Sequence, residues 1–142
     1  MASIKINTGI KTYDIEDERG NVLGQISFNA SDVNMLARLY ELQETIAELI
    51  EEVETASKDR PEEIYSVMTR IETEIKSKID YVFGDKVSEM VFGNQSIYSD
   101  VDGMSFIARF TEAVIPVIKN DLEEAMLKRA KHINEYMEQV VD

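Results

Sequence analysis

The stretch that decides the fold is YVFGDKVSEMVFGN, residues 81–94, in which the pair Phe83-Gly84 returns nine residues later as Phe92-Gly93. Phe83 ends an apolar stripe of helical period. Gly84 follows at the position where a glycine with positive φ commonly closes a helix. Each Phe therefore stands where the chain reverses and can pack into a core. These four residues are the candidate motif, with either a structural or a partner-binding role.

Between the two glycines, DKVSEMVF is expected to form one short helix. Asp85 is its predicted N-cap, and Gly93-Asn94 its predicted end.

Upstream of this segment, two apolar stripes with spacings of three and four predict two long amphipathic helices. The first stripe is Met35, Leu39, Leu42, Ile46, Leu49 and Val53, and the second is Ile64, Met68, Ile71, Ile75, Ile79 and Val82. The link TASKDRPEE between them is short, so the helices are expected to pair antiparallel.

The helix starts carry recognisable capping residues. Asn29 or Ser31 is expected to cap the first helix, with Asp32 in its first turn. Ser57 or Asp59 is expected to cap the second, with Pro61 in its first turn.

The outer face of the first helix is acidic, with no Lys or Arg among its glutamates. These are Glu41, Glu44, Glu48, Glu51, Glu52 and Glu54. Such a run is typical of a solvated face, and an acidic docking surface is the alternative.

The N-terminal residues predict a β-hairpin. Ile10–Ile15 and Val22–Phe28 are rich in β-branched and aromatic residues and flank the turn-forming DERGN. Gly20-Asn21 supplies residues that tolerate positive φ, and Val22, Ile26 and Phe28 share one face. A hairpin alone is marginally stable, so it must pack on the helices, gain SIKI as a third strand, or pair with another chain.

Downstream of the doublet, NQSIYSDVDG reads as a polar connector to a last helical region that starts near Met104 or Ser105. Its first apolar face is Ile107, Phe110, Val114, Val117 and Ile118, and its sparser continuation is Leu122, Met126, Ile133, Met137 and Val140. Pro116 should bend or break the helix. The sparse end is expected to reach outside the globule or to order only on a partner.

These elements predict an α+β fold that is mostly α, with an N-terminal hairpin of two or three strands packed on an antiparallel helical bundle. The chain is expected to be a single domain over residues 1–142, with a β-hairpin region at 1–30 and a helical region at 31–140.

Composition argues against several classes of partner and of catalytic site. The net charge is −13, with 28 acidic and 15 basic residues and no basic run, which argues against nucleic acid and anionic membranes as partners. The absence of cysteine excludes disulfides, thiolate catalysis and Cys-based zinc sites. No secretory signal and no membrane-length apolar run is visible, so a cytoplasmic protein is expected. The seven methionines are read first as core fillers and second as an adaptable binding surface.

The candidate catalytic and metal-binding residues depart from the patterns that such sites need. His132 stands among basic residues with no second His to make a metal pair. DVDG begins like a calcium loop from Asp100, but its sixth and twelfth positions hold Ser105 and Thr111 instead of Gly and Glu, so Asp102 is read as a helix N-cap. The paired glutamates lack a Glu-x-x-His partner, and no Gly-rich phosphate loop occurs. We therefore expect no enzyme, no catalytic residues, no cofactor and no metal.

The order of features resembles the small tail assembly chaperone proteins of phages and prophages of Gram-positive bacteria. In those proteins a stretch like Asp80–Gly93 has an Asp, then Phe-Gly, then a second Phe-Gly about nine residues on, followed by a helix comparable to Ser105–Asn120. Lys86-Val87 stands where the family often has Gly-Thr.

The resemblance implies a non-enzymatic factor in the cytoplasm of the bacterial host cell. Such a factor would hold the tape measure protein soluble, help deliver tail tube subunits, and be absent from the finished virion. Self-association into a homo-oligomer through a hairpin edge is also open. The alternatives are a structural phage tail or head-tail subunit that assembles through its hairpin, and a small enzyme with a buried carboxylate site.

Overall fold

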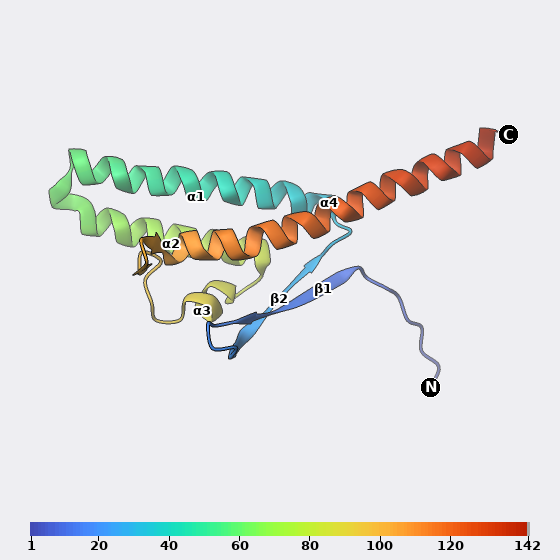
Figure 1. Cartoon of the computed structure of the whole chain (residues 1–142), viewed down its shortest axis with the longest axis horizontal. Coiled ribbons are helices and arrows are strands. Elements are labelled where there is room, and N and C mark those ends of the chain that lie inside the picture. The colour runs from blue at the N-terminus through green and yellow to red at the C-terminus, as the bar shows by residue number, and fades with distance from the viewer. Residues whose placement is uncertain (142) are drawn as a thin grey trace.

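A computed structural model describes the backbone of residues 1–141 and the side chains of residues 1–139. The elements in chain order are β1 (Ile10–Glu16), β2 (Val22–Asn29), α1 (Val33–Asp59), the 3₁₀ turn Pro61–Glu63, α2 (Ile64–Phe83), α3 (Val87–Phe92), β3 (Asp100–Val101), β4 (Met104–Ser105) and α4 (Phe106–Val141). Figure 1 shows α1 and α2 as an antiparallel pair, α4 running alongside them and past the start of α1, and the β1–β2 hairpin against the helices. The expected α+β, mostly α fold is confirmed.

The hairpin has two strands, so the third strand proposed for SIKI is wrong: residues 1–9 form none. Ile26 and Phe28 point into the core, as predicted. Val22 was expected on the same face but is 56% exposed, because the pairing register shifts between Ile15 and Glu16 at the hairpin tip. Of Gly20-Asn21, only Gly20 has a positive φ, of 82°.

Glycine at position 24 brings the hairpin close to α3. A Cβ built on Gly24 would lie 2.5 Å from Met90 Cγ, far inside normal contact. The missing side chain therefore lets β2 pack directly on the short helix that the Phe-Gly doublet encloses.

The predicted apolar stripes of α1 and α2 face each other, but their capping residues differ from the prediction. Asp32 is the N-cap of α1 and accepts a hydrogen bond from Asn34 N at 2.9 Å, so Asn29 and Ser31 are not its caps. The N-terminus of α2 has no side-chain cap, because Pro61–Glu63 forms a 3₁₀ turn before the helix. Ser57 and Asp59 instead lie inside α1.

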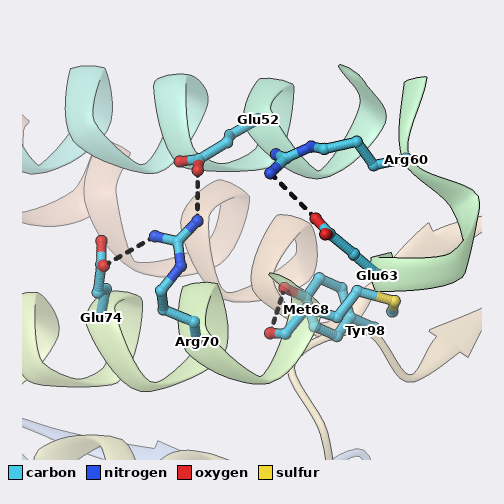
Figure 2. Close-up of polar contacts among 7 residues, drawn as sticks. All are labelled: Glu52, Arg60, Glu63, Met68, Arg70, Glu74 and Tyr98. Atoms are coloured by element: carbon cyan, nitrogen blue, oxygen red, sulfur yellow. Dashed lines mark hydrogen bonds and ion pairs between the residues drawn. The ribbon is translucent and has the colours of Figure 1, made fainter. Parts of the chain in front are cut away.

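Ion pairs on the outside of this helical pair are visible in Figure 2. The Arg70 guanidinium contacts Glu52 of α1 and Glu74 of its own helix, and Arg60 lies 3.3 Å from Glu63. All these side chains are substantially exposed, so each pair contributes at most about 1 kcal/mol. The apolar seam is the main source of cohesion here.

The segment between α3 and α4, expected to be a polar connector, packs against α2. Ile97 is fully buried, and the Tyr98 hydroxyl donates to the Met68 carbonyl at 2.9 Å (Figure 2). Desolvation and the nearby Glu72 carboxylate raise the pKa of Tyr98 to about 12. The segment is thus fastened to α2.

The start of α4 also departs from the prediction. Asp102 and Gly103 have φ of 54° and 83° and form the two-residue turn between β3 and β4, so Asp102 does not cap the helix. Ser105 Oγ accepts from Ala108 N at 3.3 Å instead. Pro116 does not break α4, which is continuous from Phe106 to Val141.

A buried carboxylate joins the hairpin to α4. Asp121 is 9% exposed; its carboxylate accepts a hydrogen bond from the Tyr13 hydroxyl and lies 3.5 Å from Lys11 Nζ. The hydrogen bond to Asp121 is the main cause of a raised pKa for Tyr13. This carboxylate is fully engaged in holding β1 to α4.

Candidate interaction surfaces

The two Phe side chains of the doublet are buried in the core and pack on the same residue. Phe83 and Phe92 are 6% and 2% exposed. Both rings pack on Phe110 of α4, with centroids at 6.1 Å and 5.7 Å, and Phe92 also meets Phe106 edge-on at 4.8 Å. The repeated motif therefore supplies two aromatic anchors for one helix. Neither ring is accessible to a partner in this conformation.

The glycines of the doublet allow the chain to reverse after each anchor. Gly84 has φ 122° and ψ 158°, and Gly93 has φ 57° and ψ −128°, both conformations that side chains disfavour. Gly84 is thus not in the left-handed helical conformation expected of it. Lys86 adopts that conformation instead, with φ 67° and ψ 8°.

Asp80 performs the capping role predicted for Asp85. Its carboxylate accepts from Ser88 N at 2.8 Å and from Ser88 Oγ at 3.0 Å, whereas Asp85 precedes the helix and makes no cap. Local capping rules look within a turn of the helix start at Val87 and miss Asp80, which lies seven positions before it. The Asp that begins the double Phe-Gly pattern was the available signal.

An apolar groove lies between α1 and α4, on the side of α1 away from the acidic pair Glu48 and Glu52. Its volume is about 350 Å³. The residues that line it are Gln43, Ile46, Ala47, Ile50, Ser105, Ile107, Ala108, Thr111 and Glu112. Its floor is the buried Ile46 and Ile107, and Ala47 lies exposed on its wall. Small residues on both helices keep it open to a side chain from outside.

The rim of this groove is acidic. Glu51 and Glu54 lie one helical turn beyond the lining residues Ala47 and Ile50, and Glu112 is itself part of the wall. All three are exposed, and none forms an ion pair with any residue up to position 139. The groove therefore suits an apolar helix with basic flanks.

The second half of α4 is the largest unpacked element. From Glu123 to Gln139 no side chain is buried, as expected for the sparse end of the helix. Figure 1 shows this end of α4 running past the other helices. Its exposed apolar side chains include Met126 at 42%, Leu127 at 71%, Ile133 at 55% and Met137 at 53%. We call residues 123–139 the tail.

The tail carries the main cluster of positive charge in an acidic chain. Lys128, Arg129 and Lys131 are exposed within four residues, and the lone His132 is 83% exposed, 3.9 Å from Glu135. At its base, Arg129 donates to the Ser31 carbonyl at 2.6 Å, beside a crevice of about 280 Å³ between α1 and α4. His132 lines this crevice but meets no second metal ligand.

Among the described residues, no three His, Asp or Glu side chains come together in a way that could hold a metal ion. Within residues 1–141, no helix combines the length and apolar character needed to cross a bilayer.

Comparisons of the chain with protein-family models, curated proteins and solved structures found no match.

Proposed function

We propose that this chain is a non-enzymatic phage tail assembly chaperone that binds the tape measure protein, the tail tube protein or both during tail morphogenesis in the bacterial cytoplasm. The proposal starts from the resemblance carried by Asp80 and the two Phe-Gly pairs. The observation that best supports it is the α1–α4 groove with its acidic rim.

The groove suits a helical client. A tape measure protein is a long helical chain that would expose apolar stripes before the phage tail forms around it. A groove floored by Ile46 and Ile107 would receive one or two side chains of such a stripe. The acidic rim would favour clients with Lys or Arg beside the stripe and would speed encounter. An interface of this size binds weakly, which suits a chaperone that must release its client when the phage tail assembles.

Co-expression with the tape measure protein tests the proposal. We expect the wild-type chain to increase the soluble fraction of the client and to co-elute with it on gel filtration. Ala47→Arg, which fills the exposed wall of the groove, should lower both. Tyr65→Asp is the matched control, because Tyr65 is 83% exposed on α2 and is not among the residues that line the groove. An insoluble client with no complex would overturn the proposal.

A structural tail or head-tail subunit is the second candidate, and the free edge of β1 favours it. In the described part of the chain β1 pairs only with β2, and the adjoining residues 1–9 expose Ile4 at 92% and Ile6 at 79%. An unpaired strand edge can accept a strand from another chain. Mass spectrometry of purified particles separates the two candidates: a subunit is present in stoichiometric amounts, whereas a chaperone is absent.

A further inference from the structure

The chain carries both a groove for an apolar helix and an exposed apolar helix. On the tail, Met126, Leu127, Ala130, Ile133 and Met137 fall on one broad face by helical spacing. Every one of them is exposed, and of these five residues only Met126, at the base of the tail, borders the crevice shared with Val33 and Leu36 of α1. An uncovered apolar face of this kind usually marks a contact with another chain.

The charges beside the two surfaces are opposite. Arg129 and Lys131 flank the middle of the apolar face of the tail, one on each side by helical spacing. Arg129 also donates to the Ser31 carbonyl, and Glu138 lies on the Lys131 side two turns further on. Glu51, Glu54 and Glu112 border the groove. A tail laid in the groove would bring these groups together and leave its apolar face against Ile46, Ala47 and Ile107.

The lengths also agree. Met126 to Met137 spans about 16 Å along a helix at 1.5 Å per residue. The groove runs along α1 from Gln43 to Ile50 and along α4 from Ser105 to Glu112, or about 10 Å by the same measure. The apolar part of a tail is thus long enough to cover the whole groove. In that position its flanking basic residues would lie over the acidic rim.

A tail cannot enter the groove of its own chain. Ala108 and Met126 belong to one continuous helix, about 27 Å apart along its axis. Only another copy can bring a tail to the groove.

We infer that the occupant of the groove in the free protein is the tail of a second copy of this chain. Because donor and acceptor surfaces differ, the contact is heterologous, and each copy added leaves one tail and one groove open. The protein therefore associates head to tail into short chains. The inference does not rest on the proposed function, since it concerns the protein alone.

Sedimentation velocity of the purified chain over a hundredfold range of concentration is the first test. We expect the weight-average mass to rise with concentration past two chains without reaching a plateau. A single-chain mass across the whole range would overturn the inference.

Two variants test the geometry. Ile133→Asp damages the tail, and Ala47→Arg blocks the groove; both positions are exposed, so circular dichroism should match wild type. Each variant alone should be monomeric, and Tyr65→Asp should associate like wild type. An equimolar mixture of the two variants should form a 1:1 dimer and nothing larger, because one intact tail and one intact groove remain. Continued self-association of either variant, or a mixture that stays monomeric, would refute the head-to-tail contact.

Discussion

The two halves of α4 have the same backbone and the same apolar period, but different surroundings. In residues 106–122 the stripe is covered, and Ile115, Ile118 and Leu122 are at most 2% exposed. In the tail the stripe continues with no buried side chain. The doublet accounts for part of the difference, because Phe83 and Phe92 pack on Phe110 in the first half. The start of α1 reaches only the base of the second half, where Val33 and Leu36 share a crevice with Met126.

A helix can thus be read correctly from its period while its role depends on what covers it. The packed half holds the fold together. The tail adds little to the fold and is available for contact with another polypeptide.

The largest expected effect comes from Phe110→Ala, in the packed half. Phe110 is 4% exposed and receives both Phe rings of the doublet, so its loss should cost about 3–5 kcal/mol of unfolding free energy. Urea unfolding followed by circular dichroism measures it. Ile133→Ala in the tail is the comparison and should change stability of the dilute protein by less than about 0.5 kcal/mol. Equal losses would show that the two halves do not differ as described.

Asp80→Ala tests how α3 keeps Phe92 in place. The change leaves Ser88 N and Oγ without their shared acceptor in a site where Ser88 is 5% exposed. We expect a loss of about 1–3 kcal/mol. Asp85→Ala should be nearly neutral, because Asp85 is exposed and caps nothing. The reverse order would restore Asp85 as the cap.

Tyr98 links α2 to the segment that leads into α4, and its pKa gives a pH signature. Its folded pKa of about 12 lies above the ordinary value of 10, so the stability it contributes is complete below pH 10 and is lost as the pH rises toward 12. In Tyr98→Phe the unfolding free energy should fall less steeply between pH 10 and pH 12. Near neutral pH the variant should be less stable by about 0.5–1.5 kcal/mol, because it lacks the hydrogen bond to the Met68 carbonyl. Tyrosinate absorbance during alkaline titration should show one late-titrating group fewer in the variant.

The smallest effect should be a gain. Lys86 has a positive φ, of 67°, that side chains disfavour. Lys86→Gly should raise the unfolding free energy by about 0.5–1 kcal/mol by removing this strain. Lys76→Gly, inside α2, is the opposite control and should destabilise by a similar amount or more. A loss in both would mean that the Lys86 conformation carries no strain.

Much of the fold could be predicted from the sequence because periodicity is a local signal. The stripes of α1, α2 and α4, the hairpin and the short helix between the glycines all follow from it. The caps were predicted less well, because Asp80 and the 3₁₀ turn at Pro61 depend on how distant segments meet. Asp102-Gly103 was read as a helix start, although two successive positive φ values make it a hairpin turn.

The interaction surfaces were only half visible in the sequence. The exposed end of α4 was predicted from its sparse stripe. The groove could not be, because it exists only where Ala47 and Ala108 face each other across two helices. Likewise, nothing local shows that Phe83 and Phe92 converge on Phe110.

Amide hydrogen exchange along α4 tests the central claim most directly, namely that the tail, unlike the first half of α4, is not buried in the core of its own chain. In dilute wild-type protein we predict that residues 107–122 exchange only on global unfolding, and that residues 123–139 exchange orders of magnitude faster. Adding the Ile133→Asp variant, whose groove is intact, should then slow exchange in the tail alone. Equal protection of both halves in the dilute protein would contradict the account.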